Sequence, residues 1–123
     1  MEKSLNITAL VQARMGSSRL YGKVMKKVCG KSLIELLLKR LSKSKLIKKI
    51  MVVTPKSNEN DVLVKKIKSL GYETFRGKEK DVLDRFYQAI KKAKPEIIIR
   101  ITGDCPLIDY KIVDKMIKLF KSK

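Results

Sequence analysis

The segment QARMGSSRLYGK, residues 12–23, contains the residues of this chain whose types and spacing could do chemistry. Its cations are Arg14, Arg19 and Lys23, and its small residues are Gly16, Ser17 and Ser18. Backbone N–H groups of such a loop can converge on an anion, while the cations supply positive charge. Gly16 also permits close approach of a ligand, because it has no Cβ. The pattern predicts a polyphosphate-binding loop, although its spacing matches neither a Walker loop nor a GxGxxG turn.

The predicted contacts to phosphate are spread along this loop. They come from Ala13, Arg14, Met15, Gly16, Ser17, Ser18, Arg19 and Lys23. The three cations are also the candidate catalytic residues, because charge on phosphoryl oxygens is stabilised by cations held nearby. Thr54 and Arg100, each near the end of another apolar run, are further candidates for contacting a nucleotide. The sequence leaves open whether Arg100 faces a helix or the nucleotide base.

Asp104 is the candidate metal ligand. It follows the apolar run EIIIRI, residues 96–101, and lies between Gly103 and Pro106, which restrict its direction. Carboxylates in such positions commonly hold Mg²⁺, which prefers oxygen ligands and is shared with substrate phosphates. Asp109 is instead expected to cap the last helix. The sequence therefore predicts that Asp104 holds Mg²⁺ in the loop after the last apolar run.

Short apolar runs alternate with amphipathic helical patterns along the chain. The predicted strands are residues 7–11, 49–54, 72–75 and 96–101. The apolar positions of the helical patterns span residues 33–41, 62–70, 82–90 and 112–120. This alternation predicts an α/β fold, a mainly parallel sheet with right-handed crossovers and helices on both faces. Ligands of such sheets bind where the strand order reverses, and the order 3-2-1-4 would place the loop after strand one opposite the Asp104 loop.

Polar residues at the expected helix starts predict N-caps. Ser32 with Glu35 three residues later predicts a capping box, and Asp81 precedes the third helical pattern. Arg76 and Arg85 are expected to lie on the surface or in salt bridges.

Composition narrows the class of protein. A length of 123 residues predicts one domain. The formal net charge of +18 comes mainly from Lys spread over helix faces and turns, which predicts a solvated basic surface that attracts anionic small molecules. A basic nucleic-acid-binding module is the alternative. Cys29 and Cys105 are predicted to be reduced thiols, and the absence of a long apolar run or a signal peptide predicts a cytoplasmic protein without a membrane span.

Residues 12–23 resemble the signature QARMGSxRLPGK of the SpsF-like spore coat polysaccharide group, within the acylneuraminate (CMP-sugar) cytidylyltransferase family. RITGDCPLID, residues 100–109, resembles a second motif of this group. Residues 30–40, 52–55 and 75–89 are similar as well, so the resemblance covers essentially the whole chain. As an alternative to a place on the surface, the resemblance around Arg76 and Arg85 implies that this segment borders the sugar site. Tyr21 departs from the signature, because the family usually has Pro there. The loss of Pro leaves the loop more chain entropy to lose when it orders on phosphate.

The resemblance implies a Rossmann-like nucleotide-diphospho-sugar transferase fold of the GT-A type. It implies transfer of CMP from CTP to an acidic sugar with release of pyrophosphate, in polysaccharide or cell-surface glycan biosynthesis, and it implies that Asp104 binds the metal.

Members of the family continue beyond the helix that ends near Phe120, with a sugar-binding surface and a second acidic metal ligand. Residues 1–123 are therefore expected to form one nucleotide-binding domain, truncated relative to the full family domain. A non-catalytic nucleotide-binding remnant is the alternative. A homodimer is also expected, because an open apolar edge of strand four would recruit another chain.

Overall fold

The central sheet of the protein is parallel and has four strands. The computed structural model describes residues 6–16, 25–28, 30–103 and 108–122. The strands are β1 (Ile7–Gln12), β4 (Lys49–Pro55), β5 (Glu73–Gly77) and β6 (Ile97–Thr102). Their spatial order is β5-β4-β1-β6, and every neighbouring pair is parallel. The predicted α/β class is confirmed. If only the four strands of this sheet are numbered in chain order, their spatial order is 3-2-1-4. The labels β4, β5 and β6 are higher than these numbers because the two short strands of a hairpin come before β4 in the chain.

The hairpin was not predicted from the sequence. It consists of β2 (Lys27–Val28) and β3 (Lys31–Ser32), which pair antiparallel outside the main sheet. Gly30 sits in the turn with a φ of 83°, a conformation that favours glycine. The hairpin leads directly into helix α1 (Leu33–Leu41).

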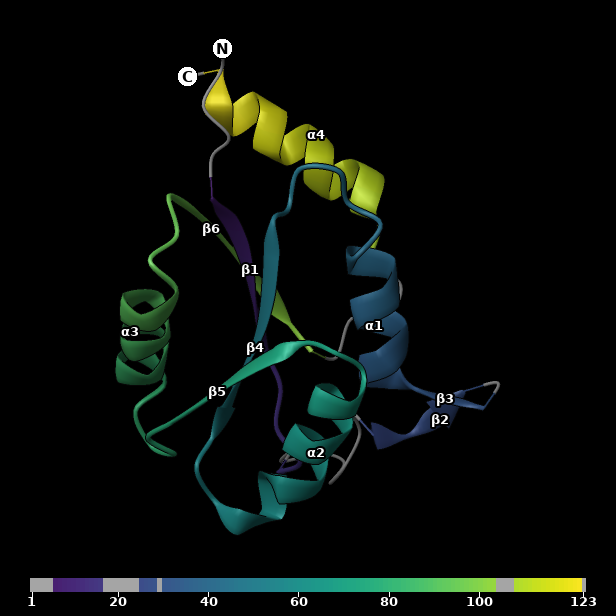
Figure 1. Cartoon of the computed structure of the whole chain (residues 1–123), viewed down its shortest axis with the longest axis vertical. Helices are drawn as coiled ribbons and strands as arrows, with labels where there is room; N and C mark the ends of the chain where they lie inside the picture. Colours follow the sequence, from purple (N-terminus) through teal and green to yellow (C-terminus); the bar gives the residue numbers. More distant parts are fainter. Residues whose placement is uncertain (1–5, 17–24, 29, 104–107, 123) are drawn as a thin grey trace.

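Helices cover the two faces of the sheet unequally. The helix α1, the helix α2 (Asp61–Ser69), which follows the short 3₁₀ turn η2 (Asn58–Asn60), and the helix α4 (Tyr110–Lys121) pack on one face. The helix α3 (Val82–Ala93) packs on the opposite face, against β1 and β4. Figure 1 shows α3 on one side and α1, α2 and α4 on the other. The strands β1 and β4 are buried on both faces, which explains their continuous apolar sequences.

The predicted helix caps are confirmed. Ser32 accepts a hydrogen bond from the Glu35 N–H at 3.3 Å, and Asp81 accepts one from the Asp84 N–H at 2.9 Å. Glu35 does not close the expected capping box through its side chain, because its carboxylate pairs with Lys66 at 3.2 Å and with Lys39 at 3.6 Å. The hydrogen bond from Lys66 lowers the pKa of Glu35.

The strand β6 lies at the end of the sheet and pairs only with β1 among the described strands. Ile98 on β6 is 41% exposed, and Met116 and Phe120 on α4 are 64% and 65% exposed. A groove of about 410 Å³ runs between β6 and α4 beside these side chains. This apolar strip is the open edge that the sequence predicted for strand four.

Candidate functional site

The carboxyl ends of β1 and β6 meet directly at one edge of the sheet. Gln12 pairs with Thr102, and the Gly103 N–H donates to the Gln12 carbonyl oxygen at 2.6 Å. A Cβ on Gly103 would lie 2.7 Å from this oxygen and 2.9 Å from the Cβ of Ala13, so only glycine fits without displacing backbone. The described parts of the two sequence motifs therefore lie side by side, as the predicted strand order requires.

Side chains continue to alternate after β1 ends. Ala13 and Met15 are 3% and 9% exposed and belong to the core beneath α1 and α2, whereas Arg14 is exposed. Arg14 is thus available to a ligand at this edge. Ala13 and Met15 can contact a ligand only through their backbone.

The loop after β1 is tied to the loop after β4 by Asn60, a residue that was not among the predicted site residues. Asn60 is fully buried, and its Oδ1 accepts from the Met15 N–H at 2.8 Å. Its Nδ2 donates to Ser57 Oγ at 2.8 Å. The Met15 N–H is therefore already paired, and so is the Ala13 N–H, which donates to the Val53 carbonyl oxygen at 3.1 Å. These hydrogen bonds hold the loop in place and do not leave either N–H directed at phosphate.

A carboxylate approaches the loop at Gly16. A Cβ on Gly16 would lie 2.8 Å from Glu59 Oε1, on the exposed turn before α2. The absence of a side chain at Gly16 makes room for this carboxylate as well as for a ligand. The sequence contained no signal for the approach, because 43 positions separate the two residues.

The two additional nucleotide-contact candidates differ in their accessibility. Arg100 Nη2 donates to Gln12 Oε1 at 3.0 Å, and its guanidinium carbon lies 4.5 Å from the centre of the Phe86 ring. This places Arg100 on the α3 side, next to the ends of β1 and β6. Thr54 is fully buried and its hydroxyl has no hydrogen-bond partner among the described residues. The geometry therefore favours Arg100 and does not favour Thr54 as a contact to nucleotide.

Arg76 lies in the type of salt bridge that the sequence predicted. Its Nη1 is 2.7 Å from Asp61 Oδ1, and its Nη2 donates to the carbonyl oxygens of Lys56 and Ser57 at 3.1 and 2.8 Å. These contacts join the end of β5 to the turn before α2. Arg76 therefore stabilises the same turn that carries Asn60.

The prediction that Arg85 lies on the surface or in a salt bridge is wrong. Arg85 is 1% exposed, and within the described part of the chain it has no carboxylate partner. Burial lowers the pKa of Arg85, and the positive charge of Arg14 lowers it further. The sequence could not reveal this burial, because Arg85 lies in a helix whose charged pattern is typical of a solvent-exposed face.

Five predicted site residues lie outside the described residues. They are Ser17, Ser18, Arg19, Lys23 and Asp104.

Among the described residues there is no group of three or more side chains of the kinds that bind metal ions. None of the described helices has the length and apolar character needed to cross a bilayer. Asp109 caps α4 by accepting from the Lys111 N–H at 2.9 Å, as the sequence predicted.

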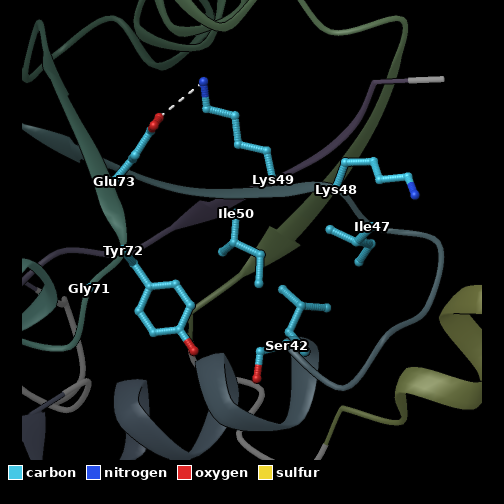
Figure 2. A pocket seen from close by; sticks show the side chains of 9 residues that line it. Ser42, Ile47, Lys48, Lys49, Ile50, Gly71, Tyr72 and Glu73 are labelled. Atoms are coloured by element: carbon cyan, nitrogen blue, oxygen red, sulfur yellow. Dashed lines mark ion pairs between the residues drawn. The ribbon is translucent and has the colours of Figure 1, made fainter. Parts of the chain in front are cut away.

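A pocket at the opposite edge of the sheet is shown in Figure 2. It has a volume of about 340 Å³ and lies at the amino ends of β4 and β5, where Lys49 and Glu73 form an ion pair at 3.1 Å. Parallel α/β sheets bind their ligands at the carboxyl ends of the strands, so this pocket is separate from the candidate site.

The chain has clear relatives among known proteins. Residues 8–123 match the family model for cytidylyltransferases. The chain is 38% identical over 117 residues to the spore coat polysaccharide biosynthesis protein SpsF of Bacillus subtilis. This alignment covers 92% of this chain and 49% of that protein. The chain is 28% identical over 116 residues to a 3-deoxy-manno-octulosonate cytidylyltransferase of Geobacter sulfurreducens. That alignment covers 92% of this chain and 44% of that protein.

A solved structure agrees with these relatives. The chain superposes on a cytidylyltransferase from Leptospira borgpetersenii with a TM-score of 0.92 and 39% sequence identity, over 97% of this chain and 50% of that chain. The chain therefore spans about half the length of the relatives that it matches.

Proposed function

Because this chain belongs to the cytidylyltransferase family, we propose that it serves in the transfer of CMP from CTP to an acidic sugar, in polysaccharide or cell-surface glycan biosynthesis. The observation that carries this proposal is the meeting of the two motif-bearing loops. The backbone hydrogen bond from Gly103 to Gln12 joins the segment that leads to Arg14 with the segment that leads to Asp104. The described ends of both loops, and Arg14 with them, thus lie at one edge of the sheet, which supports the proposal.

In the proposed reaction a sugar oxygen attacks the α-phosphorus of CTP. A bond forms between this oxygen and phosphorus, the bond from phosphorus to the bridging oxygen breaks, and pyrophosphate leaves with the electron pair. The sugar hydroxyl gives up its proton to solvent water as the bond forms. Arg14, Arg19 and Lys23 stabilise the charge on the phosphoryl oxygens, and this positioning and charge stabilisation supplies most of the catalysis in phosphoryl chemistry.

The loop that follows Gly103 suits a divalent cation, proposed here to be Mg²⁺. Gly103 packs closely against Gln12 and Ala13, and Asp104 is the next residue in the sequence. A carboxylate oxygen is the type of ligand that Mg²⁺ prefers. Bound there and shared with substrate phosphates, the cation would neutralise charge on the triphosphate.

The part of the proposal that concerns the acceptor sugar involves more polypeptide than the described residues. The matched relatives are about twice as long as this chain, and the open apolar strip along β6 and α4 is a surface on which further polypeptide could pack. Pairing of two copies along β6 is one such arrangement. A non-catalytic nucleotide-binding role is the second candidate function, because the half-length match favours it. A cytoplasmic location belongs to the same proposal.

Titration with CTP tests the phosphate loop. Lys23→Ala and Arg19→Ala are each expected to weaken CTP binding by about 10- to 150-fold, since a hydrogen bond to a charged group contributes roughly 1.5 to 3 kcal/mol. The matched control is Lys43→Ala, because Lys43 is an exposed cation in the turn after α1. Isothermal titration calorimetry with each of the four nucleoside triphosphates measures both the affinity and the base preference. Parental affinity in both loop variants would contradict the placement of the phosphates.

Asp104→Asn tests the metal site. The amide keeps the shape of the side chain but loses the charge that a hard cation needs, so most of the Mg²⁺ dependence of CTP binding is expected to disappear. Asp109→Asn is the control, because Asn also caps helices well and the fold should be retained. The measurement is CTP affinity with Mg²⁺ and with a chelator. Equal Mg²⁺ dependence in the parent and in Asp104→Asn would place the metal ligands elsewhere.

A further inference from the structure

We propose that Arg85 binds an oxyanion of the substrate, so that its guanidinium is part of the ligand site on the α3 side of the sheet. The proposal rests on the proposed function, because it assumes a phosphate- or carboxylate-bearing substrate at the carboxyl ends of β1 and β6. Its basis is a buried guanidinium that forms no ion pair with a carboxylate within the described part of the chain, although the charge of Glu79 attracts it from a distance.

The guanidinium of Arg85 is buried but largely unpaired. Arg85 is 1% exposed, and the one hydrogen bond it makes within the described residues runs from Nη2 to the Glu79 carbonyl oxygen at 3.4 Å. Its Nε and Nη1 groups have no partner there. An arginine does not lose its charge in proteins, and an uncompensated buried charge strongly destabilises a fold. An anion bound between these N–H groups would remove that penalty.

The surrounding backbone is shaped to hold the Arg85 side chain in place. A Cβ on Gly77, the last residue of β5, would lie 2.6 Å from the Cγ of Arg85 and 3.1 Å from its Cα. The absence of a side chain at Gly77 therefore allows α3 to lie against the end of β5. Asp81 caps α3 one turn before Arg85, which fixes the start of the helix. Packing therefore holds the aliphatic part of the Arg85 side chain in place, while the Nε and Nη1 groups of its guanidinium have no hydrogen-bond partner among the described residues.

A second cation faces the same region. Arg14 follows β1 and is close enough for its positive charge to lower the pKa of Arg85. Like charges repel, and within the described residues no carboxylate pairs with either guanidinium. Arg100 reaches the same α3 side and lies over the ring of Phe86, the neighbour of Arg85 in the helix. An oxyanion is the chemical group that the guanidiniums of Arg14 and Arg85 would recognise, because the planar fork of Arg matches both phosphate and carboxylate in bidentate geometry.

The test compares Arg85→Met and Arg85→Lys with the parent chain. Calorimetry measures affinity for CTP, for inorganic pyrophosphate and for a 2-keto sugar acid, and thermal denaturation measures stability without ligand. We expect Arg85→Met to lose affinity by about 30-fold or more for the ligand whose oxyanion it binds, because a buried charge loses its partner. Arg85→Lys should recover part of that loss. Lys43→Met, at an exposed position, is the control for the loss of one charge and should bind as the parent does.

Comparing the affinities for the three ligands identifies which substrate supplies the oxyanion that Arg85 binds. Loss of CTP and pyrophosphate affinity assigns Arg85 to the triphosphate, whereas loss of sugar-acid affinity alone assigns it to the sugar carboxylate. Stability without ligand should be equal or higher in Arg85→Met, because replacing an unpaired buried charge with an apolar side chain of similar volume is often stabilising.

Two results would overturn the proposal. If the parent binds these ligands and Arg85→Met binds all of them equally well, Arg85 is a structural residue and the proposed function is unaffected. If the parent binds none of the three ligands, both the oxyanion site and the proposed function are wrong.

Discussion

A polypeptide limited to these 123 residues is expected to bind CTP but to release very little pyrophosphate when an acidic sugar is added. The described residues supply cations at the ends of β1 and β6, but this stretch spans only about half the length of the matched relatives, so we expect such a polypeptide to lack the part of the site that holds the acceptor. Holding two reactants in the correct geometry contributes roughly 7 to 11 kcal/mol to lowering a barrier. Without this contribution, the rate of pyrophosphate release should be lower by about 10⁵-fold or more than that of a full-length relative assayed in parallel.

The measurement is pyrophosphate release with CTP, Mg²⁺ and a panel of acidic sugars, with CTP binding followed separately. Sugar-dependent turnover near the rate of the full-length relative would contradict the expectation. Light scattering over a range of concentrations would then show whether two copies complete the site. A dimer would support pairing along the exposed edge of β6, whereas an active monomer would mean that these residues hold the acceptor by themselves.

Leu37→Ala is expected to destabilise the protein by about 2 to 5 kcal/mol. Leu37 lies in α1, is fully buried, and belongs to the core between α1, α2 and the sheet. Truncation removes apolar contacts and leaves a cavity that the rigid sheet cannot close completely. Since a domain of this kind is stable by about 5 to 15 kcal/mol in total, the loss should be visible as a large shift of the urea midpoint.

Leu83→Ala is the matched control for this substitution. Leu83 lies in α3 and is 83% exposed, so the same chemical change should alter the free energy of unfolding by less than about 0.5 kcal/mol. Urea unfolding followed by circular dichroism compares the two variants directly. Equal midpoints for Leu37→Ala and Leu83→Ala would mean that α1 does not pack on the sheet as described.

Much of the architecture was predictable because its signals are local. The apolar runs that became β1, β4, β5 and β6 and the capping residues Ser32, Asp81 and Asp109 act through neighbours a few positions away. The handedness of βαβ crossovers then restricts how such elements can be arranged, but several strand orders satisfy the same alternation, and only the tertiary structure selects one of them. The hairpin β2-β3 was missed because two-residue strands carry almost no periodicity.

The phosphate loop was recognisable from its composition, but the role of each residue in it was not. Residue types alone placed Ala13, Met15 and Thr54 among the nucleotide contacts. In the structure the side chains of these residues are buried, and the N–H groups of Ala13 and Met15 are paired with other parts of the chain. Whether a side chain or an N–H group faces a ligand depends on what packs against it, and that information is not local.

The sequence by itself therefore determined the fold class, the family and the edge of the sheet that carries the motifs. The tertiary structure decided which residues support that edge. Asn60 reaches Met15 across 45 positions, and Gly103 reaches Gln12 across 91. Arg85 is buried because Gly77, on a different element, leaves room for its stem. Such contacts form only when elements distant in sequence pack together, and burial and the pairing of polar groups are properties of that packing and not of the residues alone.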